Sequence, residues 1–186
     1  MLCDKSDYFN SRDKYIGLLG GSFDPAHKGH LGISKIAIKK LKLKTIYWVI
    51  TKKNPFKNKT FFSLDSRINY AKKISRAQKK IQTIQLDTII KSSRSIDLIN
   101  YFIKKKKKKN IYFIIGSDNL IRFHKWKSWK KIVKLVKLIV FSRKGYDKRG
   151  MKSIVVKNFK NKIIFIKNKP ITISSTQLKK QLSLNI

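Results

Sequence analysis

Short apolar runs that alternate with stretches of helical periodicity constrain the fold of this chain most. The clearest run, residues 111–115, holds five apolar residues in succession, and similar runs cover 16–20 and 45–50. A strand that is apolar at every position is buried on both faces, which is typical of a parallel sheet covered by helices. We therefore expect an α/β fold with a doubly wound parallel sheet.

The same alternation places the expected elements along the chain. Strands are predicted at 16–20, 45–50, 81–86, 111–115, 138–141 and 163–166, and helices at 31–41, 64–76, 95–106, 119–123, 128–136 and 174–182. There is no repeat and no internal linker, and 186 residues suit one domain. Residues 1–14 are polar and mixed in charge, so we expect a loose leader followed by one domain over 15–186.

Composition restricts the function without identifying it. Lys and Arg number 46 against 9 acidic residues, a net charge of +37, and every acid is Asp. Such a charge is typical of proteins that bind nucleic acid, but it is also expected where an AT-rich genome enriches Lys in all proteins of an organism. The 41% of hydrophobic residues excludes a disordered chain, and the absence of Glu excludes any mechanism built on a catalytic Glu.

The expected location is the cytoplasm. The single cysteine, Cys3, excludes an intrachain disulfide and a cysteine-based zinc cage, which fits a reducing compartment. No apolar stretch approaches the ~20 residues that a membrane helix needs, and residues 1–15 lack the apolar core of a secretory signal. We expect no membrane partner.

The segment G-G-S-F-D-P-A-H-K-G-H-L at 20–31 lies between the first strand and the first helix. Ligands of open parallel sheets bind at the carboxyl ends of strands. Gly20 and Gly21 would let a phosphate approach the backbone, and Gly29 and His30 lie at a helix N-terminus that attracts anions. The spacing matches neither the Rossmann nor the Walker glycine pattern. His27, three residues before His30, could join it in binding phosphoryl oxygens, whereas a metal site would need a further ligand.

The joint pattern G-x-F-D-P-x-H-x-G-H is the signature of the nucleotidyltransferase superfamily that shares the H-x-G-H motif. Further motifs follow in order, namely N-P-F-K at 54–57, G-S-D-N-L at 116–120, F-H-K-W at 123–126, S-R-K-G-Y at 142–146 and I-S-S-T-Q-L-K at 173–179. Over residues 15–182 the chain thereby resembles the bacterial nicotinate-nucleotide adenylyltransferases. The resemblance implies a Rossmann-like fold of a single domain.

The resemblance also implies a reaction. The 5′-phosphate of nicotinate mononucleotide would attack the α-phosphorus of ATP in line, giving deamido-NAD and pyrophosphate in NAD biosynthesis. That nucleophile is ionised near pH 7, so neither a general base nor a covalent intermediate is needed, and catalysis reduces to positioning and charge stabilisation. Mg²⁺ is expected to bind together with ATP and to be coordinated mainly by substrate oxygens and water. No residue of the chain is predicted as a metal ligand.

Site residues follow from the motif positions. The resemblance implies catalytic roles for His27, His30 and Lys179. It places ATP beside Gly20, Gly21, Ser22, Phe23, His27, His30, Gly116, Asp118, Ser175, Thr176 and Lys179. It places the mononucleotide beside Ser22, Phe23, Asn54, Lys57, Ser95, Trp126 and Arg143. Asp118 would meet the ribose of adenosine and could also be a helix N-cap, while Trp126 would stack on the pyridine ring or belong to the core.

Two departures from the family pattern bear on recognition. Arg94 and Ser95 stand where the family commonly has Tyr-Thr, near the expected pyridine end of the site. Lys179 stands where the family usually has Arg, which keeps the charge and loses the bidentate fork. We expect weaker binding of the ATP phosphates and a retained activity.

Alternative functions stay open at this point. A sister adenylyltransferase would use nicotinamide mononucleotide or pantetheine phosphate, although the pantetheine enzyme usually has Thr at the position of His27 and lacks the Phe-x-x-Trp stretch. Resemblance to bacterial members favours nicotinate. A basic module could instead reuse the fold to bind nucleic acid without catalysis, a partner that we do not expect. The oligomeric state is left open, a homo-oligomer included.

Overall fold

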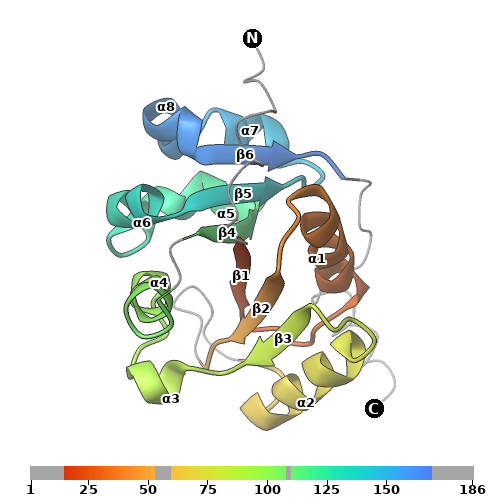
Figure 1. The fold of residues 1–186 in the computed structure, drawn as a ribbon. Coiled ribbons are helices and arrows are strands. Elements are labelled where there is room, and N and C mark those ends of the chain that lie inside the picture. The colour runs from red at the N-terminus through yellow and green to blue at the C-terminus, as the bar shows by residue number, and fades with distance from the viewer. Residues whose placement is uncertain (1–14, 53–59, 108–109, 169–186) are drawn as a thin grey trace.

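The computed structural model describes residues 15–52, 60–107 and 110–168 (Figure 1). Its centre is a six-stranded sheet in the order β3-β2-β1-β4-β5-β6. The strands are β1 (Ile16–Gly21), β2 (Thr45–Ile50), β3 (Ile81–Ile84), β4 (Ile111–Gly116), β5 (Lys137–Phe141) and β6 (Ile163–Ile166). All neighbouring strands pair in parallel, which confirms the predicted doubly wound sheet.

The strand order places the first and fourth strands side by side in the middle of the sheet. Ile16 to Leu19 of β1 pair with Thr45 to Trp48 on one side and with Ile111 to Ile114 on the other. The chain runs outward in one direction from β1 to β3 and in the other from β4 to β6, so the order reverses between β1 and β4. At such a reversal the loops diverge and leave a crevice beyond the carboxyl ends of the strands.

Helices follow the strands in turn. They are α1 (Lys28–Lys40), α2 (Leu64–Ser75), α3 (Asp87–Ile90), α4 (Ser95–Lys104), α5 (Ser117–Arg122), η1 (Phe123–Lys125), α6 (Trp129–Leu135), α7 (Asp147–Met151), α8 (Ile154–Phe159) and η2 (Lys160–Lys162). Within the described ranges, none of them is long and apolar enough to cross a membrane. The leader 1–14 and the helix predicted at 174–182 lie outside the described residues.

Several predicted boundaries were wrong. The first helix begins at Lys28 instead of 31, and the third strand ends at Ile84, where the chain turns into α3. Helices α3, α7 and α8 were not predicted. Each has four to six residues, too few to display an apolar period of 3.6.

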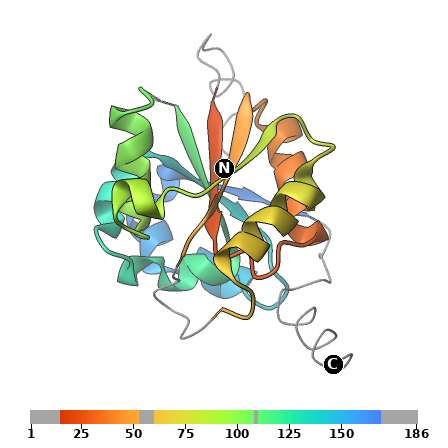
Figure 2. The ribbon, with the colours of Figure 1, turned by 90° about the horizontal axis from the view of Figure 1, so that it is seen from below.

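Helices lie on both sides of the sheet (Figures 1 and 2), and a hydrophobic core lies on each of its two faces. One core lies under α1 and α2 and includes Ala37, Trp48 and Ala71. The other lies under α4, α5, α6 and α8 and includes Val49 and Phe102. Neighbours Trp48 and Val49 face opposite cores because side chains of a strand alternate between its faces. Burial on both faces explains why these strands are apolar at nearly every position.

Candidate active site

The N-terminus of α1 is built around two histidines that cap the helix together. His27 is the N-cap, with extended φ and ψ of −152° and 171°, and its Nδ1 accepts a hydrogen bond of 3.0 Å from the amide of Gly29. The amide of His27 donates in return to Nδ1 of His30, at 3.2 Å. This is a capping box in which imidazoles replace the usual Ser and Glu. The helix therefore starts three residues before the predicted start, because these histidines satisfy amides at its first turn.

This cap determines which imidazole nitrogen carries the proton. A ring nitrogen that accepts a hydrogen bond has no proton of its own, so in each neutral imidazole the proton is on Nε2. Burial, and then the charge of Arg143, lower the pKa of His27 from 6.5 to about 4, so His27 is neutral near pH 7. Both rings can thus donate from Nε2 to an anionic oxygen.

An aromatic cluster packs against the ring of His30. The rings of Phe23 and His27 have centroids 4.6 Å and 3.9 Å from that of His30, and Trp48 meets it edge-on at 6.1 Å. The indole Nε1 of Trp48 donates to Ser34 Oγ at 2.8 Å, and that hydroxyl donates to the carbonyl of His30, also at 2.8 Å. His30 is therefore held through both its ring and its backbone.

The glycine segment before α1 offers its backbone to a ligand more than its side chains. A Cβ added at Gly20 would meet no atom within 4 Å, so the surface over this residue is open. Ser22 and Phe23 are 7% and 2% exposed, and the ring of Phe23 stacks on Trp48 instead of lining an open site. Phe23 has a positive φ of 46°, a strained conformation for a bulky residue, and such strain is most common at functional sites.

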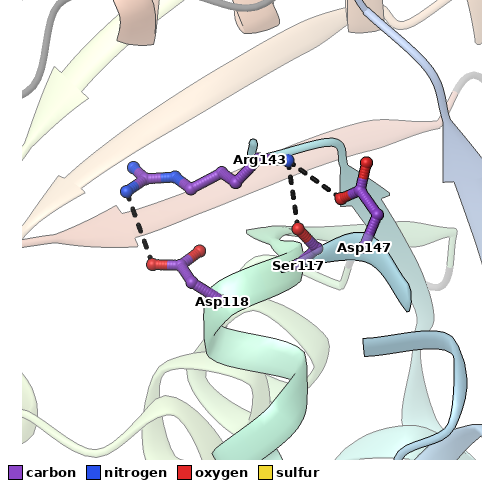
Figure 3. A network of polar contacts seen from close by, with 4 residues as sticks. All are labelled: Ser117, Asp118, Arg143 and Asp147. Atoms are coloured by element: carbon purple, nitrogen blue, oxygen red, sulfur yellow. Dashed lines mark hydrogen bonds and ion pairs between the residues drawn. The ribbon is translucent and has the colours of Figure 1, made fainter. Parts of the chain in front are cut away.

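Figure 3 shows a polar network at the carboxyl ends of β4 and β5 that brings two predicted site residues together. Asp118 Oδ2 pairs with Nη1 of Arg143 at 3.4 Å, and Asp118 Oδ1 is buried without a hydrogen-bond partner. The prediction of Asp118 as a helix N-cap was wrong, because Gly116 is the N-cap of α5 and Asp118 is its second residue. A Cβ at Gly116 would lie 2.3 Å from Asp118 Oδ1, so a larger residue here would require the carboxylate to shift.

The backbone of Arg143 is held from the other side of the same network. Its amide lies 3.0 Å from both Ser117 Oγ and Asp147 Oδ1, which share the proton (Figure 3). Burial tends to raise the pKa of Asp147, but hydrogen bonds from Ser117, from the Arg143 backbone and from Ser142 outweigh it and lower that pKa. Asp147 thus remains a carboxylate that anchors the loop after β5. It was not among the predicted site residues.

The residues predicted for the pyridine end of the site lie on the face of the sheet that α4, α5, α6 and α8 cover. Ser95 is the first residue of α4 and is half-buried. Trp126 is also half-buried. Its ring stacks on that of Phe123, with 4.8 Å between the centroids, and packs against the hydrophobic core under α4, α5, α6 and α8. Both readings of Trp126, as core and as a surface for a ring, are compatible with this position.

A cavity of about 540 Å³ opens beyond the carboxyl end of β3. Its lining is polar and carries two lysines; the lining residues are Lys52, Leu64, Gln85, Asp87, Thr88, Lys91, Ser92 and Ser93. Asp87 accepts hydrogen bonds from the amide of Lys52, at 2.7 Å, and from the hydroxyl of Ser93. Cationic side chains and hydroxyl groups in the lining suit an anionic ligand.

Sequence reasoning missed the buried arginine beside this site. Arg67 is 2% exposed and donates to backbone carbonyls of the glycine segment and of the end of β2. The signal in the sequence is that Arg is rare in this chain, with seven Arg among 46 basic residues. In the structure, positions 67, 71 and 75 form one stripe along α2 and all three are buried, and a buried arginine requires specific partners.

Five predicted site residues lie outside the described residues, namely Asn54, Lys57, Ser175, Thr176 and Lys179. The described part of the chain contains no group of three or more His, Cys, Asp or Glu side chains that could hold a metal ion. Apart from Ser95 and Trp126, the described predicted residues gather around two places, the cap of α1 and the ends of β4 and β5, on the two central strands of the sheet and their neighbour.

Comparisons with known proteins agree on one family. A family model described as cytidylyltransferase-like matches residues 18–181. A "probable nicotinate-nucleotide adenylyltransferase" of Pelagibacter ubique (strain HTCC1062) is 51% identical over 172 residues, covering 92% of this chain and 95% of that protein. A protein of the same name from Clostridium tetani (strain Massachusetts / E88) is 32% identical over 174 residues, covering 91% and 87%.

A solved structure has the same fold. It is Plasmodium falciparum nicotinic acid mononucleotide adenylyltransferase complexed with NaAD, with a TM-score of 0.69 over 90% of this chain and 83% of that chain. At 22% identity this likeness concerns the fold alone. The sequence relatives and the extent of the family match lead to one conclusion. The chain belongs to the cytidylyltransferase-like family and, within it, to the nicotinate-nucleotide adenylyltransferases.

Proposed function

We propose that this protein transfers the adenylyl group of ATP to nicotinate mononucleotide, giving deamido-NAD and pyrophosphate in NAD biosynthesis. The observation that carries the proposal is the imidazole cap of α1 beside the crevice between β1 and β4, in a chain 51% identical to a protein named for this reaction. Two imidazoles whose Nδ1 atoms accept hydrogen bonds, and whose donors are therefore at Nε2, are suited to phosphoryl oxygens. The related Plasmodium structure, complexed with NaAD, supports a dinucleotide product.

The proposed step is a single in-line displacement. An oxygen of the mononucleotide 5′-phosphate forms a bond to the α-phosphorus of ATP, while the bond to the bridging oxygen breaks and pyrophosphate leaves with the electron pair. His30 and His27 would donate from Nε2 to the phosphoryl oxygens as charge shifts toward the leaving group. The open backbone at Gly20 would let the phosphates approach the end of β1.

The polar network at β4 and β5 would serve the nucleoside parts of the substrates. The unpartnered Oδ1 of Asp118 is an acceptor for a ribose hydroxyl, which would satisfy a buried carboxylate oxygen. Arg143 is half exposed and can reach a phosphate once its weak ion pair with Asp118 is given up. The ion pair thus keeps both groups at the site before substrates bind.

Mg²⁺ belongs to this proposal as a part of the ATP substrate. In the described residues the carboxylates of Asp24, Asp87 and Asp118 are engaged separately and form no cluster of metal ligands. Bound to the phosphates, Mg²⁺ would supply charge neutralisation there. The protein's own part is to hold and orient the two anions.

The choice of mononucleotide is proposed from charge as well as from the relatives. We assign the mononucleotide to the cavity beyond β3, where the two lysines Lys52 and Lys91, against the one carboxylate of Asp87, favour a substrate with an additional carboxylate over its carboxamide. We therefore expect nicotinate mononucleotide to be preferred to nicotinamide mononucleotide.

One assay tests the whole proposal. Purified protein is incubated with ATP, Mg²⁺ and either nicotinate mononucleotide, nicotinamide mononucleotide or pantetheine phosphate, and pyrophosphate release is followed by a coupled reaction. We expect the highest kcat/KM with nicotinate mononucleotide. Release with a different acceptor alone would assign the protein to a sister activity, and no release with any of the three would refute adenylyl transfer.

A further inference from the structure

We propose that Arg67 is a positioning residue that holds the ATP side and the mononucleotide side of the site in one frame, an inference that rests on the proposed function. Its guanidinium binds backbone from segments that lie on either side of the reacting groups. The side chain is only 2% exposed, so its role would be exerted through the backbone that it holds.

The guanidinium donates to four carbonyls from three segments. Nη1 donates to Ser22 of the glycine segment at 2.6 Å and to Thr51 after β2 at 2.9 Å. Nη2 donates to Lys52 at 3.4 Å, and Nε donates to Phe62, before α2, at 3.3 Å. Only the planar fork of an arginine can reach so many acceptors from one side chain.

Two carboxylates hold the amides of the same peptide segments. Asp24 accepts from the amides of Phe61 and Phe62, both at 2.9 Å. Asp87 accepts from the amide of Lys52 at 2.7 Å. Phe62 and Lys52 are therefore each held at both backbone groups, at the carbonyl by Arg67 and at the amide by an aspartate.

The charge of Arg67 is maintained although the side chain is buried. Burial lowers the pKa of Arg67, while the nearby charges of Asp24 and Asp87 raise it. Both carboxylates also bind backbone amides, so each compensates the guanidinium without occupying its donors. The N–H groups of Arg67 therefore donate to backbone carbonyls instead of to a carboxylate. Such an arrangement positions the backbone, which a simple ion pair would not do.

The connected segments lead to both substrates. Ser22 lies five residues before the cap of α1, in the segment that would contact the ATP phosphates. Lys52, Asp87 and Ser93 line the 540 Å³ cavity that we assign to the mononucleotide. A displacement between these halves would separate the attacking oxygen from the α-phosphorus, and in-line reactions lose about 100-fold in rate for a misplacement of roughly 1 Å.

The test compares two arginines of one helix. Arg67→Lys keeps a positive charge and loses the fork, and Arg76→Lys makes the same change at an exposed position at the end of α2. For each folded protein we would measure kcat, the melting temperature, and the separate dissociation constants of a non-hydrolysable ATP analogue and of nicotinate mononucleotide. The binary constants report each half of the site by itself, whereas kcat reports their alignment.

We expect Arg67→Lys to lower kcat by about 100-fold while each binary constant stays within about threefold of wild type. Arg76→Lys should match wild type in every measurement. A folded Arg67→Lys protein with kcat within threefold of wild type, or one that loses binary affinity as much as kcat, would overturn the proposal. Inactive wild-type protein would instead refute the proposed function.

A second variant covers the case in which Arg67→Lys does not fold. Asp87→Ala releases the amide of Lys52 and removes no group that accepts a hydrogen bond from Arg67. It should lower kcat by about tenfold with the affinity for the ATP analogue unchanged, since that half of the site is not touched. Unchanged kcat in Asp87→Ala would overturn the coupling between the halves.

Discussion

The imidazole of His27 has one observed role and one proposed role, which one pair of substitutions can separate. Nδ1 caps α1 by accepting from the amide of Gly29, and Nε2 is the atom that we propose donates to phosphate. Asparagine is among the best N-cap residues but has no group at the position of Nε2, whereas alanine has neither function. His27→Asn should therefore keep much of the stability and lose the activity, while His27→Ala should lose both.

The magnitudes follow from the geometry. Loss of an N-cap costs about 1 kcal/mol, and the space left by a ring that is 6% exposed adds roughly 1 kcal/mol or more in His27→Ala. For a protein of this size each kcal/mol lowers the melting temperature by roughly 2–4 °C, so His27→Ala should melt roughly 4–8 °C below wild type and His27→Asn about half as far below. Loss of one donor to the transition state should lower kcat in both variants by about 10²–10³-fold.

Differential scanning calorimetry and the pyrophosphate assay measure the two effects. Ser63→Ala is the matched control, because Ser63 caps α2 through the amide of Ser66 and lies outside the proposed contacts to substrate. It should lose about 1 kcal/mol and keep wild-type kcat. Wild-type activity in His27→Asn would refute the phosphate role, and a His27→Asn protein no more stable than His27→Ala would refute the capping role.

The remaining predictions concern pH and two glycines. Because the pKa of His27 is lowered to about 4, between pH 6.5 and pH 4 its imidazole binds a proton in the unfolded chain but not in the folded protein. The stability that this group contributes is therefore complete above pH 6.5 and is lost as the pH falls through 4. The pH dependence of unfolding should thus be shallower in His27→Asn by at most about 1.4 kcal/mol per pH unit, and equal slopes would contradict it. Gly17→Ala places a Cβ 2.7 Å from Ile46 Cγ1 and should cost about 1–3 kcal/mol in urea unfolding. Gly116→Ala would push Asp118 away and should raise the KM for ATP more than the KM for the mononucleotide, which steady-state kinetics can compare.

Local pattern was sufficient for the sheet and for the turn between β1 and α1, whose role in binding phosphate stays a prediction. Each of the six strands was predicted because a strand buried on both faces must be apolar at consecutive positions. The glycine segment before α1 was identified because glycines next to a helix N-terminus are a local arrangement for anions. The start of α1 was misplaced because a pair of imidazoles is not a usual capping signal.

Short elements escaped prediction for a different reason. Helices such as α7 and α8 are set by contacts with neighbouring elements, and their five or six residues carry too little periodicity to be recognised. Ser128, the residue before α6, illustrates this: it has a positive φ of 55°, a conformation that a serine in the sequence does not predict. Tertiary packing determines such conformations.

What the sequence determined by itself was a parallel α/β sheet, a glycine turn before the first helix and a family. What only the tertiary structure decided was which distant residues meet. Asp118 and Arg143 are paired across two strands, and Arg67 binds Ser22 across 45 positions of sequence. The physical reason is that periodicity and capping depend on neighbours in the chain, whereas a buried charge is stabilised by whatever donors and acceptors the fold brings to it.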